Sequence, residues 1–415
     1  MKVLQCHNLY QQPGGEDRVV RDEAELLQSR GHEVVQFTKH NDSISEFSRV
    51  RLALETIWSC QSARELKQLV RDEQPDVVHF HNTLPLISPA AYSAARSQGA
   101  AVVQTLHNYR FVCPSATLFR NGTTCERCVG KAFAWPAVRH GCYRGSSSAS
   151  SVVAVMLAVH RSLKTYSRAI DAYIACSNFA RQKLVEGGLP EAKIFVKPNF
   201  LVGDLRANRE RGDYAMFLGR LSPEKGIDTL LAAWEMLPPS TRLKLVGNGP
   251  LADRVQEAAS RCPHIEWLPG KSDTEVADLM AAARFLILPS VNYEGFPKTI
   301  VESLALGTPI VASNLGAMAE LIDDQRTGRL FRPGDAGHLA AVVNELYADG
   351  RALAEMRIEA RREYEEKYTA QRNYELLLEV YRNAIARRRG AVLPLAEREP
   401  ARPAIEHQTM RLPVS

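Results

Sequence analysis

The sequence predicts an α/β protein of two doubly wound domains, each a parallel sheet with helices on both sides. Short β-rich runs recur along the chain, and several are almost entirely apolar, as strands buried on both faces of a sheet are. Helical stretches separate these runs, and strand, helix, strand at this spacing gives parallel pairing. The same layout occurs twice, once on each side of a polar stretch at 203–213.

In the first half, a helical stretch follows the first β-rich run. It places Val20, Ala24 and Leu27 on one face and stops at Gly31, because glycine commonly ends helices. In the second half, strands again alternate with helical segments. The expected strands are 3–6, 33–37, 76–80, 101–106, 173–176 and 194–196 in the first half, and 215–218, 243–246, 265–268, 285–288 and 310–312 in the second.

These elements predict a first domain at 1–202, with a cysteine-rich insertion at about 110–145, and a second domain at 214–370 after the linker 203–213. A helix at 371–390 is amphipathic and must dock on a domain. From residue 391 the Pro-, Arg- and Glu-rich sequence has no period, so we expect disorder there. The apolar face of the helix consists of Tyr374, Leu377, Leu378, Tyr381 and Ile385.

The composition is that of an ordinary globular protein: of 415 residues, 45% are hydrophobic and 24% charged. The net charge of +5 is mild and mixed, so nothing demands nucleic acid as a partner. Met1 and Lys2 lead into an apolar stretch without a secretory signal, so we expect a cytoplasmic protein. The longest apolar run, 152–159, is far below the roughly 20 residues of a membrane helix.

The sequence does not decide whether the protein contacts the inner face of a membrane. The basic run at 387–389 suits either a solvated helix end or an anionic membrane surface. The apolar helix expected at 149–166 suits either the core or a membrane contact, and it belongs to the domain expected to hold the acceptor.

Gly14 and Gly15 follow the first strand and lie close to the start of the first helix. Their backbone can approach a ligand, and the helix N-terminus favours negative charge. A tight turn without a ligand explains them equally well. The full Gly-x-Gly-x-x-Gly pattern and the acidic residue beyond the second strand are lacking, which disfavours a dehydrogenase.

Two cations follow the first strand of the second domain. Arg220 and Lys225 lie in the stretch 219–226, at the carboxyl edge of a parallel sheet, where ligands bind. Together they could hold a diphosphate and oppose the charge that grows as it leaves. A solvated loop is the alternative for such a pair.

Two glutamates flank a later turn from strand to helix. In the stretch PSVNYEGFPKTIVE at 289–302, Glu294 lies in the loop and Glu302 about one turn into a helix that begins near Lys298 or Thr299. The loop can present Glu294 and free backbone donors to a sugar and its phosphates. Glu302 can accept a hydrogen bond from a ribose hydroxyl.

These motifs resemble those of glycosyltransferase family 4, a group of retaining transferases with the GT-B fold that includes bacterial polysaccharide and cell-wall enzymes. The resemblance covers nearly the whole chain. It rests on the segments GGED at 14–17, TLHN at 105–108, GRLSPEKGIDTLLAAW at 219–234, VGNGP at 246–250 and EGFPKTIVESLALGTPIVAS at 294–313.

The resemblance implies that a sugar moves from a nucleotide-diphosphate donor to a saccharide or lipid-linked acceptor, without a metal cofactor. Glu294 would contact the donor sugar, Glu302 the ribose, and Arg220 and Lys225 the diphosphate. The fold further implies a closing helix that crosses back to the first domain.

His107 would lie in the facing domain beside the donor sugar, and Gly15, with Gly14, would contact donor phosphate or acceptor. A buried structural histidine is the alternative for His107. Many relatives have glycine where this chain has Pro297, which lacks an amide hydrogen. Donor contacts at this turn would therefore come from Gly295, Phe296, Lys298 and Thr299.

Four cysteines fall within the insertion, separated by eleven, two and thirteen residues. This is the ligand count of a closed tetrahedral zinc site, which could support a segment with little core of its own. Unligated thiols and a redox pair are the alternatives. The four are Cys113, Cys125, Cys128 and Cys142, whereas Cys6, Cys60, Cys176 and Cys262 are expected to be small buried hydrophobes.

Other functions stay open at this point. A non-hydrolysing sugar-nucleotide epimerase of the same fold would convert the donor without any acceptor. A non-catalytic binding protein would use the cysteine-rich segment as an interaction module. The sequence does not determine the base, the sugar, the acceptor or the oligomeric state.

Overall fold

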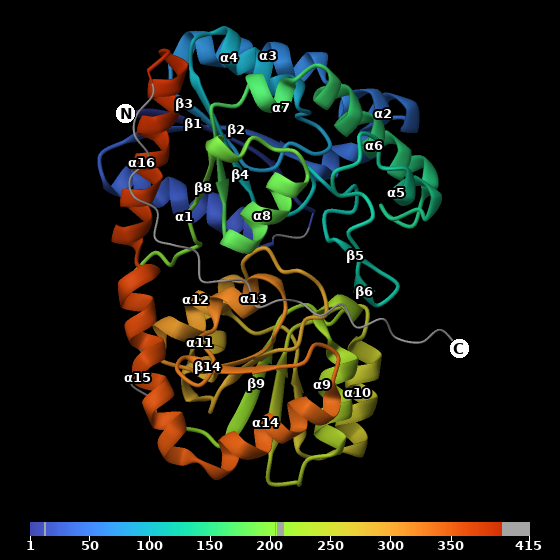
Figure 1. The fold of residues 1–415 in the computed structure, drawn as a ribbon, viewed down its shortest axis with the longest axis vertical. Coiled ribbons are helices and arrows are strands. Elements are labelled where there is room, and N and C mark those ends of the chain that lie inside the picture. Colours follow the sequence, from blue (N-terminus) through green and yellow to red (C-terminus); the bar gives the residue numbers. More distant parts are fainter. Residues whose placement is uncertain (12–13, 204, 206–210, 392–415) are drawn as a thin grey trace.

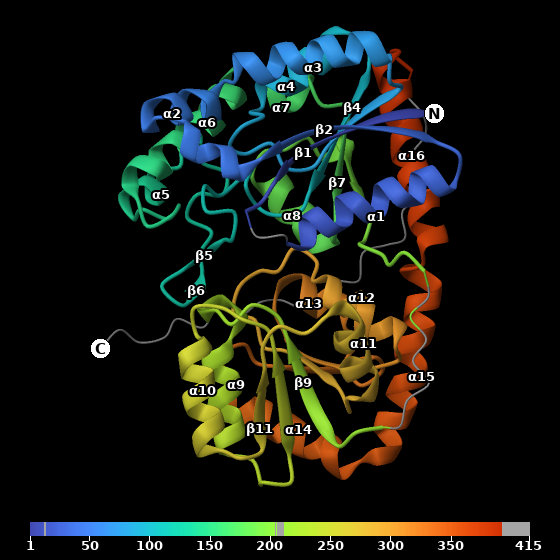
Figure 2. The same cartoon turned by 180° about the vertical axis from the view of Figure 1, so that it is seen from behind.

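The computed structural model describes residues 1–11, 14–203, 205 and 211–391. It consists of two α/β domains, one formed by the first half of the chain and the other by the second half (Figures 1 and 2). The expected fold class is confirmed. The expected linker lies partly outside the described residues, and the expected disordered tail lies outside them from residue 392 onward.

The first domain contains a sheet of parallel strands in the order β2-β1-β3-β4-β7-β8. β2 lies on one side of β1, and β3 and the strands after it lie on the other side. The direction in which strands are added therefore reverses between β1 and β3. The strands are β1 Lys2–Leu9, β2 Glu33–His40, β3 Val77–Phe80, β4 Ala101–Leu106, β7 Ala172–Ala175 and β8 Ile194–Val196.

The second domain repeats this plan in the order β11-β10-β9-β12-β13-β14, again with parallel strands. Its order reverses between β9 and β12. The last strand was not expected, because it is short and begins with a glycine and an arginine. The strands are β9 Tyr214–Leu218, β10 Arg242–Val246, β11 Ile265–Leu268, β12 Leu286–Leu288, β13 Ile310–Ser313 and β14 Gly328–Phe331.

Helices cover both faces of each sheet. In the first helix of the chain, Val20, Ala24 and Leu27 are buried, as their spacing predicts. In the first domain the helices are α1 Gly15–Ser29, α2 Arg49–Ile57, α3 Cys60–Glu73, α4 Ala90–Ser97, α5 Trp135–Arg139, α6 Ser147–Ser162, α7 Thr165–Arg168 and α8 Asn178–Glu186. In the second they are α9 Ile227–Glu235, α10 Ala252–Arg261, α11 Asp273–Ala282, α12 Lys298–Ala305, α13 Gly316–Leu321 and α14 Ala336–Ala348.

The helix expected at 149–166 is interrupted. Lys164 has a left-handed φ of 57°, which ends α6 and starts the short α7. Val153, Met156 and Leu157 of α6 are buried in the core of the first domain. Among the described residues, none of the helices has the length and apolar character needed to cross a membrane.

The C-terminal helices join the two domains. α15 (Gly350–Lys367) packs on α12, and α16 (Ala370–Arg388) then returns to the first domain, where it packs on β4 and β7. Figure 1 shows the two helices running along one side of both domains. The apolar face of α16 is buried with strand residues of the first sheet, so the crossing helix is confirmed.

The cysteine-rich insertion contains a small antiparallel hairpin, β5 (Phe119–Arg120) and β6 (Thr123–Thr124). Both views show the hairpin pointing from the first domain toward the second (Figures 1 and 2). The insertion therefore lies beside the boundary between the domains.

Candidate active site

Lys225 and Glu294 form an ion pair at the carboxyl edge of the second sheet. Lys225 ends η3 (Pro223–Lys225), which follows β9, and Glu294 lies in the loop after β12. Its Oε1 atom lies 2.7 Å from the Nζ of Lys225 and also accepts a 2.7 Å hydrogen bond from the Ser290 hydroxyl. Because the strand order reverses between β9 and β12, this pair lies at the position where doubly wound sheets bind ligands.

Gly226 fixes these two loops relative to each other. Its φ of 72° is left-handed, and a Cβ at this position would lie 1.9 Å from the carbonyl oxygen of Pro289. The amide of Val291 also donates a 2.9 Å hydrogen bond to the carbonyl of Glu224. A side chain at residue 226 would force the loops apart, so glycine is required for the Lys225–Glu294 contact.

Arg220 lies on the same loop as Lys225, just after β9, and is exposed. Within the described part of the chain, its guanidinium forms neither an ion pair nor a hydrogen bond. The structure therefore places Arg220 at the expected edge of the sheet without bringing it into contact with Glu294. Its donors are available to a ligand at this edge.

Side chains of the first domain hold the loop that contains Glu294. Three successive carbonyl groups, those of residues 294–296, each accept a hydrogen bond from that domain. The donors are the Tyr109 hydroxyl at 3.3 Å, the Ser177 hydroxyl at 3.1 Å and the Asn199 amide at 3.1 Å. The position of Glu294 therefore depends on how the two domains are docked.

Gly295 is in direct contact with His107. A Cβ on Gly295 would lie 2.7 Å from the carbonyl oxygen of His107, so only glycine fits between the domains here. The side chain of Phe296 points into the second domain, where it is 8% exposed and packs edge-to-face on Tyr368. Any ligand contact of Phe296 must then come from its backbone.

Pro297 is the N-cap of α12, and Lys298 and Thr299 supply the first amides of the helix. Such amides have no acceptor within the helix and can bind an anion. The side chain of Lys298 forms an ion pair with Asp22 of α1, and both groups are nearly buried. Lys298 therefore contacts the other domain through its side chain.

Glu302 lies on α12 and contacts α1. Its Oε1 accepts a 3.3 Å hydrogen bond from Arg18, whose guanidinium also pairs with Asp273 of α11. Burial raises the pKa of Glu302, and the positive charge of Arg18 opposes this. The carboxylate expected to bind ribose is thus engaged by an arginine from the facing domain.

Gly14 and Gly15 lie where expected, at the start of α1. Gly14 is the N-cap, and its amide donates a 2.7 Å hydrogen bond to Asp17. Both glycines are exposed, and a Cβ on Gly15 would have no heavy atom within 4 Å. No packing constraint in the described structure explains Gly15, which leaves room for a ligand.

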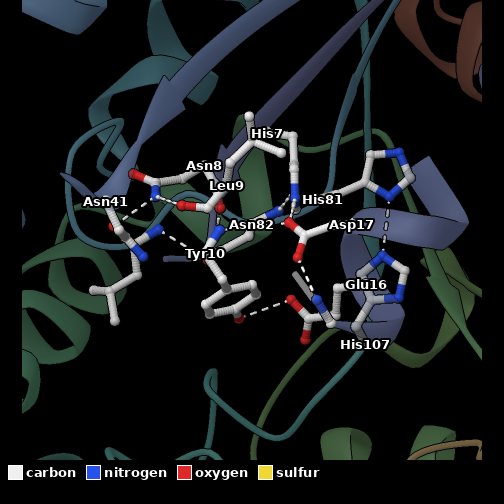
Figure 3. A network of polar contacts seen from close by, with 12 residues as sticks. His7, Asn8, Leu9, Tyr10, Glu16, Asp17, Asn41, His81, Asn82 and His107 are labelled. Carbon is white, nitrogen blue, oxygen red and sulfur yellow. Dashed lines mark hydrogen bonds and ion pairs between the residues drawn. The ribbon is translucent and has the colours of Figure 1, made fainter. Parts of the chain in front are cut away.

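His107 follows β4 and belongs to a row of histidines at the edge of the first sheet (Figure 3). Its Nε2 lies 2.9 Å from Nδ1 of His81, and His7 lies 2.8 Å from Asp17. Burial lowers the pKa of His107 to about 4, so the ring is neutral at pH 7. His107 can donate or accept a hydrogen bond, but it adds no charge next to a diphosphate.

His107 also borders a cavity with a volume of ≈ 30 Å³. This cavity lies within the first domain, between the loop after β4 and α6, and is lined by Asn82, Arg110 and Met156 among others. Neither Lys225 nor Glu294 borders it. The cavity is therefore separate from the ion pair.

Behind this row, Glu23 is fully buried on α1. Its Oε1 lies 2.9 Å from Nδ1 of His79 and its Oε2 3.2 Å from the Nζ of Lys197. Burial alone would raise the pKa of Glu23, but these two groups outweigh it and lower the pKa to about 2. The Tyr381 hydroxyl of α16 lies 2.8 Å from the same nitrogen of His79.

Glu23, His79 and His81 could in principle hold a metal ion. Among the described residues, they are the one group of three His, Cys, Asp or Glu side chains whose donor atoms all lie within 4.8 Å of one another. Lys197 supplies a cation that pairs with the charge of Glu23, although neither Glu23 oxygen nor the Nε2 of His81 forms a hydrogen bond in the described structure. We interpret it as a structural network that ties α16 and α1 to the histidines at the sheet edge.

The family models match both halves of the chain. "Glycosyltransferase Family 4" matches residues 13–201 and "Glycosyl transferases group 1" matches residues 206–363. An uncharacterized glycosyltransferase of Methanocaldococcus jannaschii is 30% identical over 42% of this chain, a stretch that spans 49% of that relative. The glycogen synthase of Mycobacterium tuberculosis is 26% identical, with 95% of both chains covered.

This chain is a family 4 glycosyltransferase. Its fold is that of solved relatives: a protein of Anabaena, crystallised in complex with UDP, superposes with a TM-score of 0.66 at 18% identity and covers 91% of this chain and 99% of its own. The enzyme class and the two-domain GT-B fold expected from the motifs are thereby confirmed.

In this glycosyltransferase, several residues around the ion pair had not been expected from the sequence. Arg18 and Asp22 lie four residues apart on α1 and face the second domain, but charged pairs at this spacing also occur on solvated helices. Glu23 did carry a signal, because it lies between Val20 and Leu27 on the apolar face of the helix. A carboxylate in that position needs buried partners.

The eight cysteines of the glycosyltransferase differ in burial and in whether they lie together. The four in the insertion line one small cavity. Among the others, Cys6 and Cys176 are buried as expected, whereas Cys60 is exposed and Cys262 is half-buried. The expectation was wrong for Cys60 because it opens α3, where a small polar residue can face solvent.

Proposed function

We propose that this enzyme is a retaining glycosyltransferase that uses a nucleoside-diphosphate sugar and transfers the sugar to a saccharide or lipid-linked acceptor in polysaccharide or glycolipid synthesis. The observation that carries this proposal is the Lys225–Glu294 ion pair at the point where the strand order of the second sheet reverses. Arg220 is exposed at the same edge. Two cations and a carboxylate there suit a diphosphate joined to a sugar.

In the proposed reaction, the oxygen of an acceptor hydroxyl attacks the anomeric carbon on the face from which the diphosphate leaves. The bond between the anomeric carbon and the diphosphate oxygen breaks, and its electron pair stays on that oxygen. The hydroxyl proton passes to the departing diphosphate. Configuration is therefore retained, and neither Glu294 nor Glu302 forms a covalent bond to the sugar.

The side chains have separate roles in this scheme. Arg220 and Lys225 stabilise the charge of the departing diphosphate, and this contribution replaces that of a metal ion. The second oxygen of Glu294 accepts a hydrogen bond from a sugar hydroxyl. Glu302 accepts one from the ribose once Arg18 has moved away, and the amides of Gly295, Phe296, Lys298 and Thr299 are in reach of the phosphates.

In the first domain, His107 contributes a neutral hydrogen-bonding group beside the sugar. Gly14 and Gly15 leave open space at the start of α1, where phosphate or acceptor can approach the backbone. We place the acceptor in this domain and the reaction on the cytoplasmic side, with peripheral membrane contact if the acceptor is a lipid.

The relatives support a sugar nucleotide as donor. The Anabaena protein has been solved with UDP, with UDP and glucose, and with UDP-glucose, and one of the relatives is named a glycogen synthase. A uridine nucleotide is thus the first donor to test. Guanosine and adenosine sugars belong in the same panel, since the described residues do not select a base.

The test is a thermal-shift screen of nucleotide sugars, followed by product analysis. A donor at a hundred times its dissociation constant adds about 2.7 kcal/mol of stability. With donor and a panel of acceptors, we expect release of the nucleoside diphosphate, unchanged rates in EDTA, and an anomeric proton signal that shows retained configuration. A Glu294→Ala variant should lose transfer.

Two outcomes would overturn the proposal, and a third would overturn only the retained configuration. Conversion of the donor without acceptor would indicate an epimerase. A non-catalytic binding module would be indicated if the wild type released no nucleotide and the Glu294→Ala variant still bound its partner normally. An inverted product would contradict retention alone.

A further inference from the structure

We propose that Cys113, Cys125, Cys128 and Cys142 bind one structural zinc ion. All four side chains line a single cavity of ≈ 10 Å³ in the insertion of the first domain. They come from separate points of the chain: the loop after β4, the residue after β6, the following turn and the loop before α6. Convergence of four cysteines from different loops and turns on one small cavity gives the ligand set of a closed tetrahedral site.

The charges around the cavity suit a zinc–thiolate centre. Four thiolates and one Zn²⁺ carry a net charge of −2, and Arg120, Arg127 and His140 line the same cavity. The Nε atom of Arg120 is buried and has no hydrogen-bond partner in the described structure. A buried donor without a partner is costly, and a thiolate sulfur would satisfy it.

The insertion has little else to stabilise it. Its hairpin strands contain two residues each, and most of the segment consists of turns. Val112 and Leu118 reach the core of the first domain, but the separate cluster beneath the insertion has only Cys128, Ala134, Ala137 and Ala154 as buried members. Side chains this small bury little apolar surface, so a metal ion would supply the stability that a core normally provides.

Metal binding requires the sulfurs to move closer together. Zinc–sulfur bonds of about 2.3 Å place the sulfurs of a tetrahedral site about 3.8 Å apart. Within the described residues, no three of these sulfurs lie within 4.8 Å of one another. The Sγ of Cys113 instead lies 3.1 Å from the Ser115 hydroxyl, a contact that rotation of the cysteine side chain would exchange for zinc.

The site would fix a segment that touches the active-site loop. Cys125 and Cys128 flank Glu126, whose carboxylate lies 3.0 Å from the Nζ of Lys183 and accepts a hydrogen bond from the hydroxyl of Tyr293. Tyr293 directly precedes Glu294. This consequence for catalysis rests on the proposed function, whereas zinc binding itself does not.

The test is the metal content of the full-length protein, purified without added metal or chelator. Elemental analysis should find one equivalent of zinc per chain, released when a mercurial titrates the thiols. The double variant Cys125→Ser/Cys128→Ser should contain none, while Cys60→Ser and Cys262→Ser, which change cysteines outside the cavity, should keep it. Wild-type protein without zinc, with all its thiols free or with two of them in a disulfide, would overturn the proposal.

A second measurement on the wild type keeps the test decisive if the double variant does not fold. Exchange of the bound ion for Co²⁺ should give the strong visible bands of tetrahedral cobalt and the ultraviolet charge-transfer band of thiolate ligands. A spectrum without the thiolate band would show that the metal binds elsewhere. Failure to bind sugar nucleotides would contradict the proposed function and leave these two readouts unaffected.

Discussion

Arg18 in the first domain donates a 3.3 Å hydrogen bond to Oε1 of Glu302 in the second. The two residues lie on α1 and α12, and Arg18 also pairs with Asp273. The contact joins the domains across the face on which we place the donor ribose. A ribose hydroxyl and Arg18 would therefore compete for the same carboxylate oxygen.

We expect Arg18→Ala to bind the sugar nucleotide more tightly, since the donor no longer has to displace the guanidinium. A partly exposed ion pair of this kind is worth about 1 kcal/mol, so the dissociation constant should fall about fivefold. Isothermal titration calorimetry measures this change. Arg181→Ala, which removes a comparable pair with Glu191, is the control. Weaker binding by Arg18→Ala would mean that Arg18 itself contacts the donor.

Lys225→Ala should lower kcat by about a hundredfold, because the departing diphosphate loses one charge-assisted contact. The variant also leaves Glu294 without its cation. Release of nucleoside diphosphate at saturating donor and acceptor measures the effect. Lys39→Ala is a matched control, since Lys39 forms a 2.6 Å pair with Glu65 at a similar exposure far from the site. A wild-type kcat for Lys225→Ala would remove Lys225 from the mechanism.

Glu23→Gln should destabilise the protein by about 3 to 5 kcal/mol, because His79 and Lys197 would face a buried neutral group. Urea unfolding at pH 7 tests this, with Glu65→Gln on the surface as control. A loss below about 1 kcal/mol would show that the network does not depend on the Glu23 charge.

The same carboxylate predicts a pH dependence. The pKa of Glu23 is lowered from 4.5 to about 2 in the folded protein. A depressed carboxyl pKa contributes stability that is complete above the unfolded value and is lost as pH falls toward the folded one. Between pH 5 and pH 2 the wild type should therefore lose more stability than Glu23→Gln. Parallel curves for the two proteins would contradict this.

Gly226→Ala should separate the two active-site loops, because the added Cβ would clash with the loop that follows β12. Gly226 and Gly270 both have left-handed φ angles, 72° and 67°, but only at Gly226 would a Cβ meet the Pro289 carbonyl. Gly270→Ala should cost about 1 kcal/mol from backbone strain alone. Gly226→Ala should cost about 2 kcal/mol more and lose activity, as thermal unfolding and nucleotide release would show. Equal costs would mean that the loops can separate freely.

Much of this fold could be predicted from the sequence because its signals are local. Apolar runs of strand length and the order of elements together predicted two parallel sheets, and helical spacing predicted an amphipathic helix at 371–390. β14 was missed because two of its four residues are glycine and arginine, which are not typical of a buried strand. Lys225 and Glu294 could be selected because each follows an expected strand at the edge where ligands bind.

The remaining parts of the site depend on contacts between distant residues. Arg18 and Glu302 are 284 positions apart, and no periodicity within α1 indicates which domain its charged face meets. Likewise, the row of histidines forms only because parallel strands bring His7, His81 and His107 to one edge.

The sequence by itself determined the two parallel sheets, an amphipathic helix near the end of the chain and the residue types available at the carboxyl edges of the strands. It could do so because apolar periodicity and turn chemistry act over a few neighbouring residues. The tertiary structure decided which of those residues meet. It pairs Lys225 with Glu294, holds the loop at 294–296 by donors from the other domain and gathers four cysteines around one cavity. The ion pair and the cysteine cluster form inside one domain each, whereas the loop contacts form between the domains. In each case the partners are separated in the chain, so no local pattern of residues encodes the contact.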